Sequence, residues 1–182
     1  MDIMFRDYVC FSQQSSFFEK LGVIGIPVHI LKSEKKSTLL RVLQEQKHRK
    51  ELVVVEGGYL NRFILEHRDI DILVNPEKGI EKDSLHARNS GLNQVLCKLA
   101  HQHDMSIGFS FSEILSCEKE ARAILFGRMM QNVRLCRKYK VKMVIGSFAK
   151  NEFELRNRDA LLSFGVFLGM KPEEAKKALE RL

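Results

Sequence analysis

A chain of 182 residues is long enough to bury a hydrophobic core, and its composition, 45% hydrophobic and 29% charged, is that of a folded rather than a disordered protein. The lack of any proline-rich, glycine-rich or low-complexity stretch predicts one domain over residues 1–182. The formal net charge of +7 favours an anionic partner, and no apolar run approaches the roughly eighteen residues of a membrane-spanning helix.

The amino-terminal residues and the cysteines both bear on the compartment. The first ten residues carry early charges and no long apolar core, so they do not read as a signal peptide. The four cysteines are widely spaced and include no CxxC pair, which favours free thiols over a zinc ribbon or a disulfide framework. We therefore expect a cytoplasmic protein with no membrane partner.

Short apolar runs rich in valine and isoleucine alternate with stretches of helical periodicity along the whole chain. These runs mostly lack strict alternation of apolar and polar residues, as expected of strands that are covered on both faces. In chain order, the pattern predicts strands over residues 3–9 and 23–30, a helix over 37–47, a strand over 52–55, a helix over 59–67, a strand over 70–74, a helix over 87–103, a strand over 105–109, a helix over 118–139, a strand over 141–145, and two helices, over 159–168 and after Pro172.

This alternation of strands and helices, with short connections, predicts an α/β protein with parallel strands and right-handed crossovers. A barrel and an open doubly wound sheet both satisfy the pattern. A complete eight-stranded barrel usually needs about 250 residues, so a barrel built from this chain has to be compact or incomplete.

Two short motifs contain residue types that can bind phosphate or metal ions. Gly57 and Gly58 lie between a strand and a helix, where a phosphate-binding turn could sit, but the lack of a GxGxxG or GKS/GKT pattern favours a simple tight turn. His101 and His103 could bind a metal ion if partners lay nearby. Alternatively, the two histidines lie at the negative, carboxyl-terminal end of a helix, where positive charge is stabilised. We favour this second interpretation over a metal site.

Carboxylates near the ends of predicted strands are candidates for acid–base chemistry, because barrel enzymes react at the carboxyl ends of their strands. Glu56 follows the third strand, Glu113 follows the fifth, and Asp7 and Asp71 lie within strands. No nucleophile elbow or Cys–His signature accompanies them. The sequence therefore does not favour an independent active site.

The basic residues form the strongest candidate binding set. Residues 128–142 contain six arginines and lysines with no acidic residue, and residues 32–50 contain seven against two glutamates. Two such clusters favour nucleic acid over a small acidic substrate, although a solvated charged face is the simpler alternative. Because Tyr139 and Phe148 are the only obvious stacking candidates, we expect contacts to the backbone of a folded RNA. The predicted RNA-binding residues are Arg68, Arg88, Arg128, Arg134, Arg137, Lys138, Lys140, Lys142 and Arg156.

Within the helix over 118–139, the apolar residues form one stripe at helical spacing, while Arg134 and Lys138 fall away from it and Arg137 lies at its edge. We therefore expect a helix that packs on the core through one face and presents a basic flank.

Four segments in a fixed order resemble a known family. They are IDILVNP at 70–76, HARNSGLN at 86–93, NVRLCRKYKVKMVIGSFA at 132–149 and ELRNRDALLSFGVFLGM at 154–170. Together they are similar to the TIM-barrel-like ribonuclease P and MRP protein subunits, whose archaeal members are called protein component 3. The resemblance covers nearly the whole chain and is strongest from Ile70 onward. One departure is that the family's Ser-Ser-Gly-Ala turn is Gly-Ser-Phe-Ala here, at 146–149.

This resemblance implies a compact or incomplete TIM-like (β/α) barrel with parallel strands. It implies a subunit of an endoribonuclease particle that binds ribonuclease P RNA and precursor tRNA, and that associates with other protein subunits, especially component 2. The catalytic RNA, with its magnesium ions, removes the 5′ leader, so the polypeptide is expected not to be catalytic by itself and to bind no cofactor. The resemblance points to Arg68 and Arg88, and to the group around Arg134, Arg137 and Lys138, as the residues that face RNA.

Two other functions remain open at this point. A stand-alone metal-dependent phosphoesterase on a related barrel would use Asp7, Glu56, and His101 or His103 as ligands, and these residues would have to converge at one mouth of the barrel. A small-molecule enzyme would need a deep pocket with polar groups at the carboxyl ends of the strands.

Overall fold

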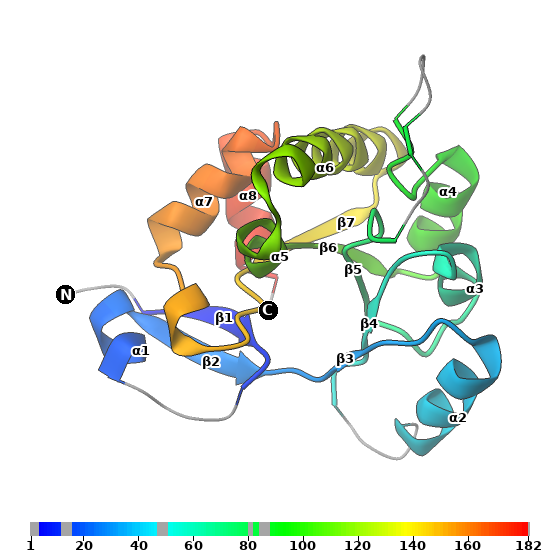
Figure 1. Ribbon diagram of the computed structural model, residues 1–182, viewed down its shortest axis with the longest axis horizontal. Helices are drawn as coiled ribbons and strands as arrows, with labels where there is room; N and C mark the ends of the chain where they lie inside the picture. Colours follow the sequence, from blue (N-terminus) through cyan, green and yellow to red (C-terminus); the bar gives the residue numbers. More distant parts are fainter. Residues whose placement is uncertain (1–3, 12–15, 47–50, 80–81, 84–87, 182) are drawn as a thin grey trace.

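The computed structural model describes residues 4–11, 16–46, 51–79, 82–83 and 88–181, and its strands are all parallel to their neighbours (Figure 1). One sheet pairs β1 (Phe5–Val9) with β2 (Val23–Pro27). The second sheet runs in chain order through β3 (Ile30–Leu31), β4 (Val54–Glu56), β5 (Ile72–Val74), β6 (Ser106–Ser110) and β7 (Lys142–Gly146).

The two sheets join at both edges. Only residues 28–29 separate β2 from β3, so the chain passes directly from one sheet into the other. At the opposite edge, Val9 forms a parallel bridge with Ala149, and the Cys10 amide donates to the Ala149 carbonyl at 2.7 Å. The Ser147 amide donates to the Asp7 carboxylate at 2.7 Å in the same place. These contacts confirm the expected compact, incomplete TIM-like barrel with parallel strands.

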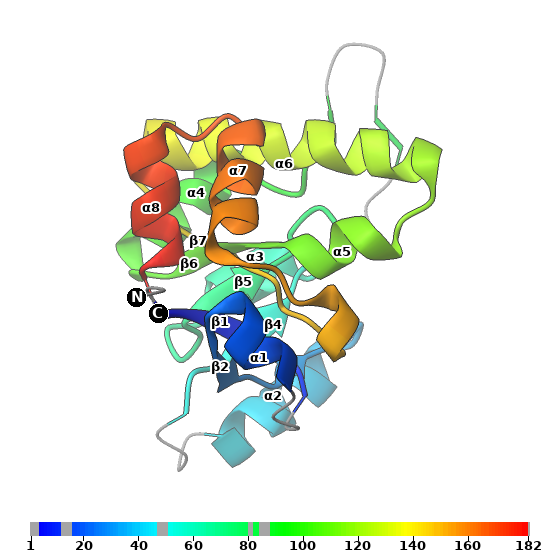
Figure 2. The ribbon, with the colours of Figure 1, turned by 90° about the vertical axis from the view of Figure 1, so that its left-hand side faces the viewer.

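Helices surround the strands on the outside (Figures 1 and 2). They are α1 (Ser16–Leu21), α2 (Lys36–Gln46), α3 (Asn61–Leu65), α4 (Gln94–Gln102), α5 (Phe111–Ser116), α6 (Lys119–Tyr139), the 3₁₀ helix η1 (Glu152–Glu154), α7 (Arg158–Phe167) and α8 (Pro172–Leu179). Among the described residues, no helix combines the length and the hydropathy needed to cross a membrane.

Two hydrophobic clusters follow the alternation of side chains along the strands. Tyr8, Val54, Ile72, Val144 and Phe148 pack together inside the barrel. The residues between them in the strands point outward and pack against the helices, in a cluster that includes Leu73, Ile107, Ile145, Met129 and Val133. Each strand of the second sheet is thus covered on both faces, which explains why the sequence showed apolar runs rather than alternation.

Several predicted boundaries need correction. The helix predicted over 87–103 begins only at Gln94, because Asn93 has an extended backbone and its side-chain oxygen accepts hydrogen bonds from Val95 N and Leu96 N. The strand predicted over 23–30 divides into β2 and β3, and the short helices α1 and α5 were not predicted. Residues 3, 47 and 87, which end three predicted elements, lie outside the described residues.

Candidate nucleic-acid interface and barrel mouth

Four of the predicted basic residues lie together where α6 ends and β7 begins. Arg134 and Lys138 are exposed one helical turn apart, and Lys140 is exposed at the end of the helix with a left-handed backbone, φ 56°. Lys142 begins β7 and pairs with Asp104 at 2.5 Å. We call these four residues the α6–β7 basic group. It lies at the end of the barrel where the strands begin.

Arg137, from the same helix, binds other residues of the protein. Its Nε lies 2.8 Å from Glu174 Oε1, and its Nη2 lies 2.6 Å from both Glu174 Oε2 and the Gly169 carbonyl oxygen. Hydrogen bonding from Arg137 lowers the pKa of the Glu174 carboxyl to about 2. The bidentate pair ties α6 to the first turn of α8. We therefore remove Arg137 from the set of proposed RNA contacts.

Arg128 is buried, in contrast to the prediction of an RNA contact. Its side chain pairs with Asp83 at 2.9 Å and donates to the Glu77 carbonyl at 3.4 Å, and the residue is only 8% exposed. The sequence spacing already indicated this burial. Arg128 lies three residues after Leu125 and four before Asn132, which places it on the buried face of α6. We withdraw it from the proposed interface.

The other three predicted arginines lie in different places. Arg68 is exposed just before β5, at the same end of the barrel as the α6–β7 basic group. Arg88 is exposed and rests on α6, where its Nη1 donates to the Gly127 carbonyl at 3.3 Å. Arg156 is half-buried at the opposite end, with its guanidinium 5.0 Å from the centre of the Phe111 ring. The predicted set therefore does not form a single patch.

A buried polar cluster lies beneath the segment that carries Arg88. Asn132 Nδ2 donates to Glu77 Oε2 at 3.0 Å and to the Ser90 carbonyl at 2.9 Å. Burial raises the pKa of Glu77 to about 8, so its carboxyl is protonated at neutral pH. Sequence reasoning missed Glu77, because the partners come from residues more than forty positions away. The cluster fixes the Arg88 segment against α6.

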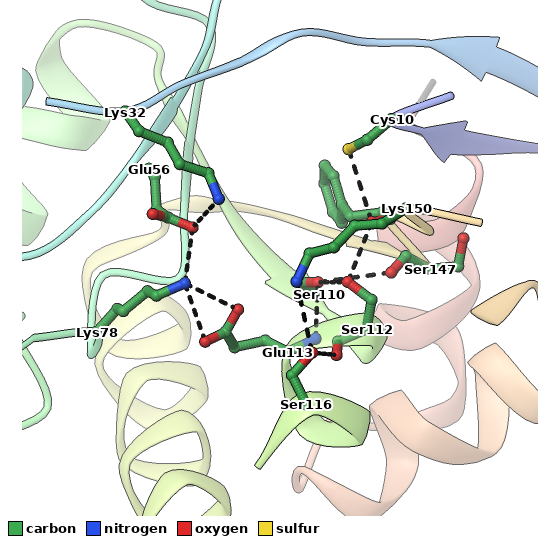
Figure 3. A network of polar contacts seen from close by, with 11 residues as sticks. Cys10, Lys32, Glu56, Lys78, Ser110, Ser112, Glu113, Ser116, Ser147 and Lys150 are labelled. Carbon is green, nitrogen blue, oxygen red and sulfur yellow. Dashed lines mark hydrogen bonds and ion pairs between the residues drawn. The ribbon is translucent and has the colours of Figure 1, made fainter. Parts of the chain in front are cut away.

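The mouth of the barrel is the end where the parallel strands finish, and a chain of ion pairs crosses it (Figure 3). Lys78 Nζ lies 3.0 Å from Glu56 and 3.1 Å from Glu113. Lys32 Nζ lies 3.5 Å from the same Glu56 oxygen. Burial opposes protonation of Lys78, but hydrogen bonding to Glu56 and the charge of Glu113 outweigh it and raise the pKa. Both carboxylates are thus held in ion pairs with lysines.

Hydroxyl groups complete the other side of the mouth. Ser112 Oγ donates to the Phe148 carbonyl at 3.0 Å, and the Cys10 thiol donates to the same oxygen at 3.6 Å. Lys150 Nζ donates to Ser116 Oγ at 3.4 Å. These contacts connect β1, α5 and the turn after β7, which closes the barrel at this end (Figure 3).

The ligands that a phosphoesterase would need do not converge. Asp7 is buried and accepts from Ser147, and burial raises its pKa to about 6. Glu56 lies at the mouth, whereas His101 and His103 end α4, at the other end of the barrel. Within the described residues, no three His, Cys, Asp or Glu side chains are grouped to hold a metal ion. The geometry required by the phosphoesterase alternative is therefore not met.

A pocket of 410 Å³ does open at the mouth, as the small-molecule alternative requires. Its lining includes Lys32, Glu56, Tyr59 and Lys78. Ion pairs join three of its charged groups, Lys32, Glu56 and Lys78, and the exposed Glu34 also lines it. The pocket thus offers charges of both signs to a ligand.

Comparison with known proteins gives a consistent result. The profile of the family described as RNase P subunit p30 matches residues 28–182. Ribonuclease P protein component 3 of Methanocaldococcus jannaschii is 32% identical over 154 residues, which cover 82% of this chain and 62% of that protein. The protein of the same name from Thermococcus kodakarensis is 30% identical over 154 residues, which cover 84% of this chain and 66% of that protein. The chain thus spans less than two thirds of the length of these relatives.

A solved structure extends the similarity to three dimensions. One chain in the cryo-EM structure of archaeal ribonuclease P with mature tRNA superposes with a TM-score of 0.73 at 27% sequence identity. The superposition covers 97% of this chain and 77% of that one.

Proposed function

This chain belongs to the ribonuclease P subunit p30 family, and from that premise we propose that it is a protein subunit of ribonuclease P. It binds the RNA of the particle and supports removal of the 5′ leader from precursor tRNA. The observation that carries the proposal is the superposition of 97% of the chain on one chain of an archaeal ribonuclease P structure.

The α6–β7 basic group is the proposed RNA contact. Arg134, Lys138 and Lys140 are exposed on one end of α6, with Arg68 at the same end of the barrel. Arginine and lysine side chains neutralise phosphates and release condensed counterions. This release strengthens binding to RNA of any sequence, and the binding weakens as the salt concentration rises. By lowering the repulsion between phosphates, the chain stabilises the folded RNA.

The protein contributes no nucleophile or general base in this proposal. The ion pairs of Glu56 and Glu113 support this part of the proposal, because lysine ammonium groups lie 3.0–3.5 Å from the two carboxylates and neutralise them. The hydrolytic chemistry then belongs to the RNA and to the magnesium ions that the RNA holds.

We also propose that the chain pairs with protein component 2 of the particle, as the family resemblance implies. Co-expression with component 2 and purification through a tag on one partner tests this pairing. Recovery of a complex of the two chains supports it, and recovery of the tagged chain alone contradicts it.

Titration of ribonuclease P RNA at several salt concentrations tests the proposed contact. Each of the changes Arg134→Gln, Lys138→Gln and Lys140→Gln is expected to weaken binding and to reduce the slope of log affinity against log salt by about one. Lys119→Gln is a matched control, because Lys119 is an exposed lysine at the other end of α6. Binding that is insensitive to salt, or equal losses in all four variants, would contradict the assignment.

A further inference from the structure

Two aromatic rings stand exposed on loops at the mouth of the barrel. Tyr59 is 76% exposed in the turn after β4, and Phe153 is 73% exposed in η1, after β7. Because β4 and β7 lie in the same parallel sheet, both loops leave the same end of the barrel. The stacking candidates predicted from sequence were different, and Phe148 is in fact only 1% exposed, while Tyr139 is half-buried.

Local hydrogen bonds fix the position of Phe153. Its amide donates to Asn151 Oδ1 at 3.0 Å, and its carbonyl accepts from Arg156 Nη1 at 2.9 Å. Its ring packs edge-on against Phe17, with the ring centres 5.9 Å apart. An exposed ring that is already held in place loses little conformational entropy when it binds a partner.

Tyr59 is placed by the glycine turn before it. Gly58 has φ 144°, a conformation that favours glycine, and its amide donates to Asn61 Oδ1 at 2.8 Å. The ring lines the 410 Å³ pocket beside Gly79. Gly79 carries no side chain to cover the ring, so a planar group can approach Tyr59 from the pocket.

Three lysines lie on loops at the same end of the barrel, and two of them, Lys32 and Lys78, line the pocket with Tyr59. The side chains of Lys32 and Lys78 are 55% and 36% exposed, while those of Glu56 and Glu113 are only 13% exposed. Lys150 is also exposed, and Figure 3 shows the three lysines extending from different loops toward the same region. The side chains of these lysines are thus more exposed than those of Glu56 and Glu113, and the exposed Glu34 lines the pocket beside them.

The thiols at the mouth respond to the same lysines. Burial raises the pKa of Cys10 to about 11, and the charges of Lys32 and Lys150 act against this rise. Burial also raises the pKa of Cys117, against the charges of Lys78 and Lys150 among others. Lys150 thus acts on both thiols, Lys32 acts on Cys10 and Lys78 acts on Cys117, while the carboxylates of Glu154 and Asp7 act on Cys10 in the opposite sense.

We propose that the mouth of the barrel binds unpaired RNA nucleotides, whose bases stack on Tyr59 and Phe153 while Lys32, Lys78 and Lys150 contact the phosphates. Base–aromatic stacking combined with a basic track is the usual design of single-strand binding surfaces. The inference rests on the proposed function in taking RNA as the partner. It adds a second site, at the opposite end of the barrel from the α6–β7 basic group.

The composition of the mouth favours RNA over a protein partner. Protein interfaces have an apolar centre and are depleted in lysine. Here the two rings belong to separate loops, and Lys32, Lys78 and Lys150 lie on loops at the same end of the barrel. Such a surface offers phosphates more contacts than it offers an apolar protein side chain.

Fluorescence anisotropy with a single-stranded oligouridylate about twelve nucleotides long tests the site in the full chain. Tyr59→Leu and Phe153→Leu keep an apolar side chain but remove the stacking face, and each is expected to weaken binding by roughly 5-fold to 100-fold. Tyr59→Phe keeps the ring and is expected to bind as the unchanged chain does. Phe167→Leu is the matched control, because Phe167 is 57% exposed on α7, away from the loops of the mouth.

Three results would overturn the inference. They are no measurable binding of oligouridylate by the unchanged chain, an affinity in both leucine variants equal to that of the unchanged chain, or a loss in the Phe167→Leu control equal to that in the leucine variants of the mouth. Weaker pairing with component 2, with RNA binding unchanged, would assign the mouth to a protein partner instead. Reconstituted cleavage of precursor tRNA tests the proposed ribonuclease P function separately. A failure of the RNA site at the mouth can therefore be distinguished from a failure of the proposed function.

Discussion

Phe148 adopts a left-handed backbone conformation, φ 47°, that a bulky residue rarely takes. The resembling family has glycine in this position of the turn, where such a conformation has little steric cost. In this chain the ring is 1% exposed and stacks on Tyr8 inside the barrel, with 5.2 Å between ring centres. Burial of the ring therefore offsets the backbone strain.

This balance predicts an unusual order of stabilities. Phe148→Ala loses the buried ring and keeps the strain, which costs about 3–5 kcal/mol of unfolding free energy. Phe148→Gly also loses the ring but relieves the strain, and is expected to be more stable than the alanine variant by about 1 kcal/mol. Urea unfolding of the two variants measures the difference. A more stable alanine variant would show that the turn does not need a left-handed residue.

Glu77 predicts a dependence of stability on pH. Burial raises its pKa from the model-compound value of 4.5 to about 8, so between these values the unfolded chain releases a proton that the folded chain retains. The unfolding free energy that depends on Glu77 is therefore fully present below pH 4.5 and declines as the pH rises to about 8.

The variant Glu77→Gln carries a neutral side chain of the same shape at every pH. Its stability relative to the unchanged chain is expected to rise by a few kcal/mol between about pH 5 and about pH 8. Urea unfolding of both proteins at the two pH values measures this, and the comparison cancels the smaller contribution of Asp7, whose pKa is about 6. A difference that does not change with pH would mean that Glu77 is ionised in the folded protein.

Arg134 and Arg137 lie three residues apart on α6 but are expected to have different roles. Arg134 is expected to contribute to RNA binding, and Arg137 to the stability of the fold. Arg137→Gln breaks the bidentate pair with Glu174 and is expected to lower the unfolding free energy by roughly 1 kcal/mol, since the pair is partly screened by solvent. Arg134→Gln is expected to change stability by less than about 0.5 kcal/mol. Thermal unfolding of both variants provides the measurement. If Arg137→Gln leaves stability unchanged, the residue returns to the candidate RNA contacts.

Among the secondary-structure elements, α4 depends on the residue just before it. Asn93 caps the helix, and its side-chain oxygen accepts two backbone hydrogen bonds, at 2.9 and 3.0 Å. Asn93→Ala is expected to cost about 1 kcal/mol of unfolding free energy, whereas Asn93→Ser retains most of the stability. Equal stability of the two variants in urea unfolding would contradict the capping role.

Elements with long regular patterns were predictable from sequence, and those set by tertiary contacts were not. The helix predicted over 118–139 is observed as α6, Lys119–Tyr139, because its apolar stripe repeats over many turns. The helix α5 follows β6 without an intervening turn, so no Gly or Pro marked its start. The ion pairs of Glu56 and Glu113 with Lys78 were not predictable, because the three residues come from β4, α5 and the loop after β5, which are far apart in the sequence.

For the molecule as a whole, the family resemblance predicted the barrel, and chain length required that any barrel be compact or incomplete. The observed ring closes through the Val9–Ala149 bridge and the Asp7–Ser147 hydrogen bond rather than through a longer ladder between β1 and β7. This closure joins residues about 140 positions apart, which no local pattern reveals. The same closed barrel separates the α6–β7 basic group, where strands begin, from the mouth, where they end.

The central claim is that the chain supports catalysis by RNA without being catalytic itself. The most direct test is cleavage of precursor tRNA by the cognate ribonuclease P RNA and the other protein subunits, with this chain added or omitted. We predict faster cleavage when the chain is present, a smaller gain when Arg134, Lys138 and Lys140 are all changed to Gln, and no cleavage by the chain alone. Cleavage that is unaffected by the chain, or cleavage by the chain alone that a chelator abolishes, would contradict the account.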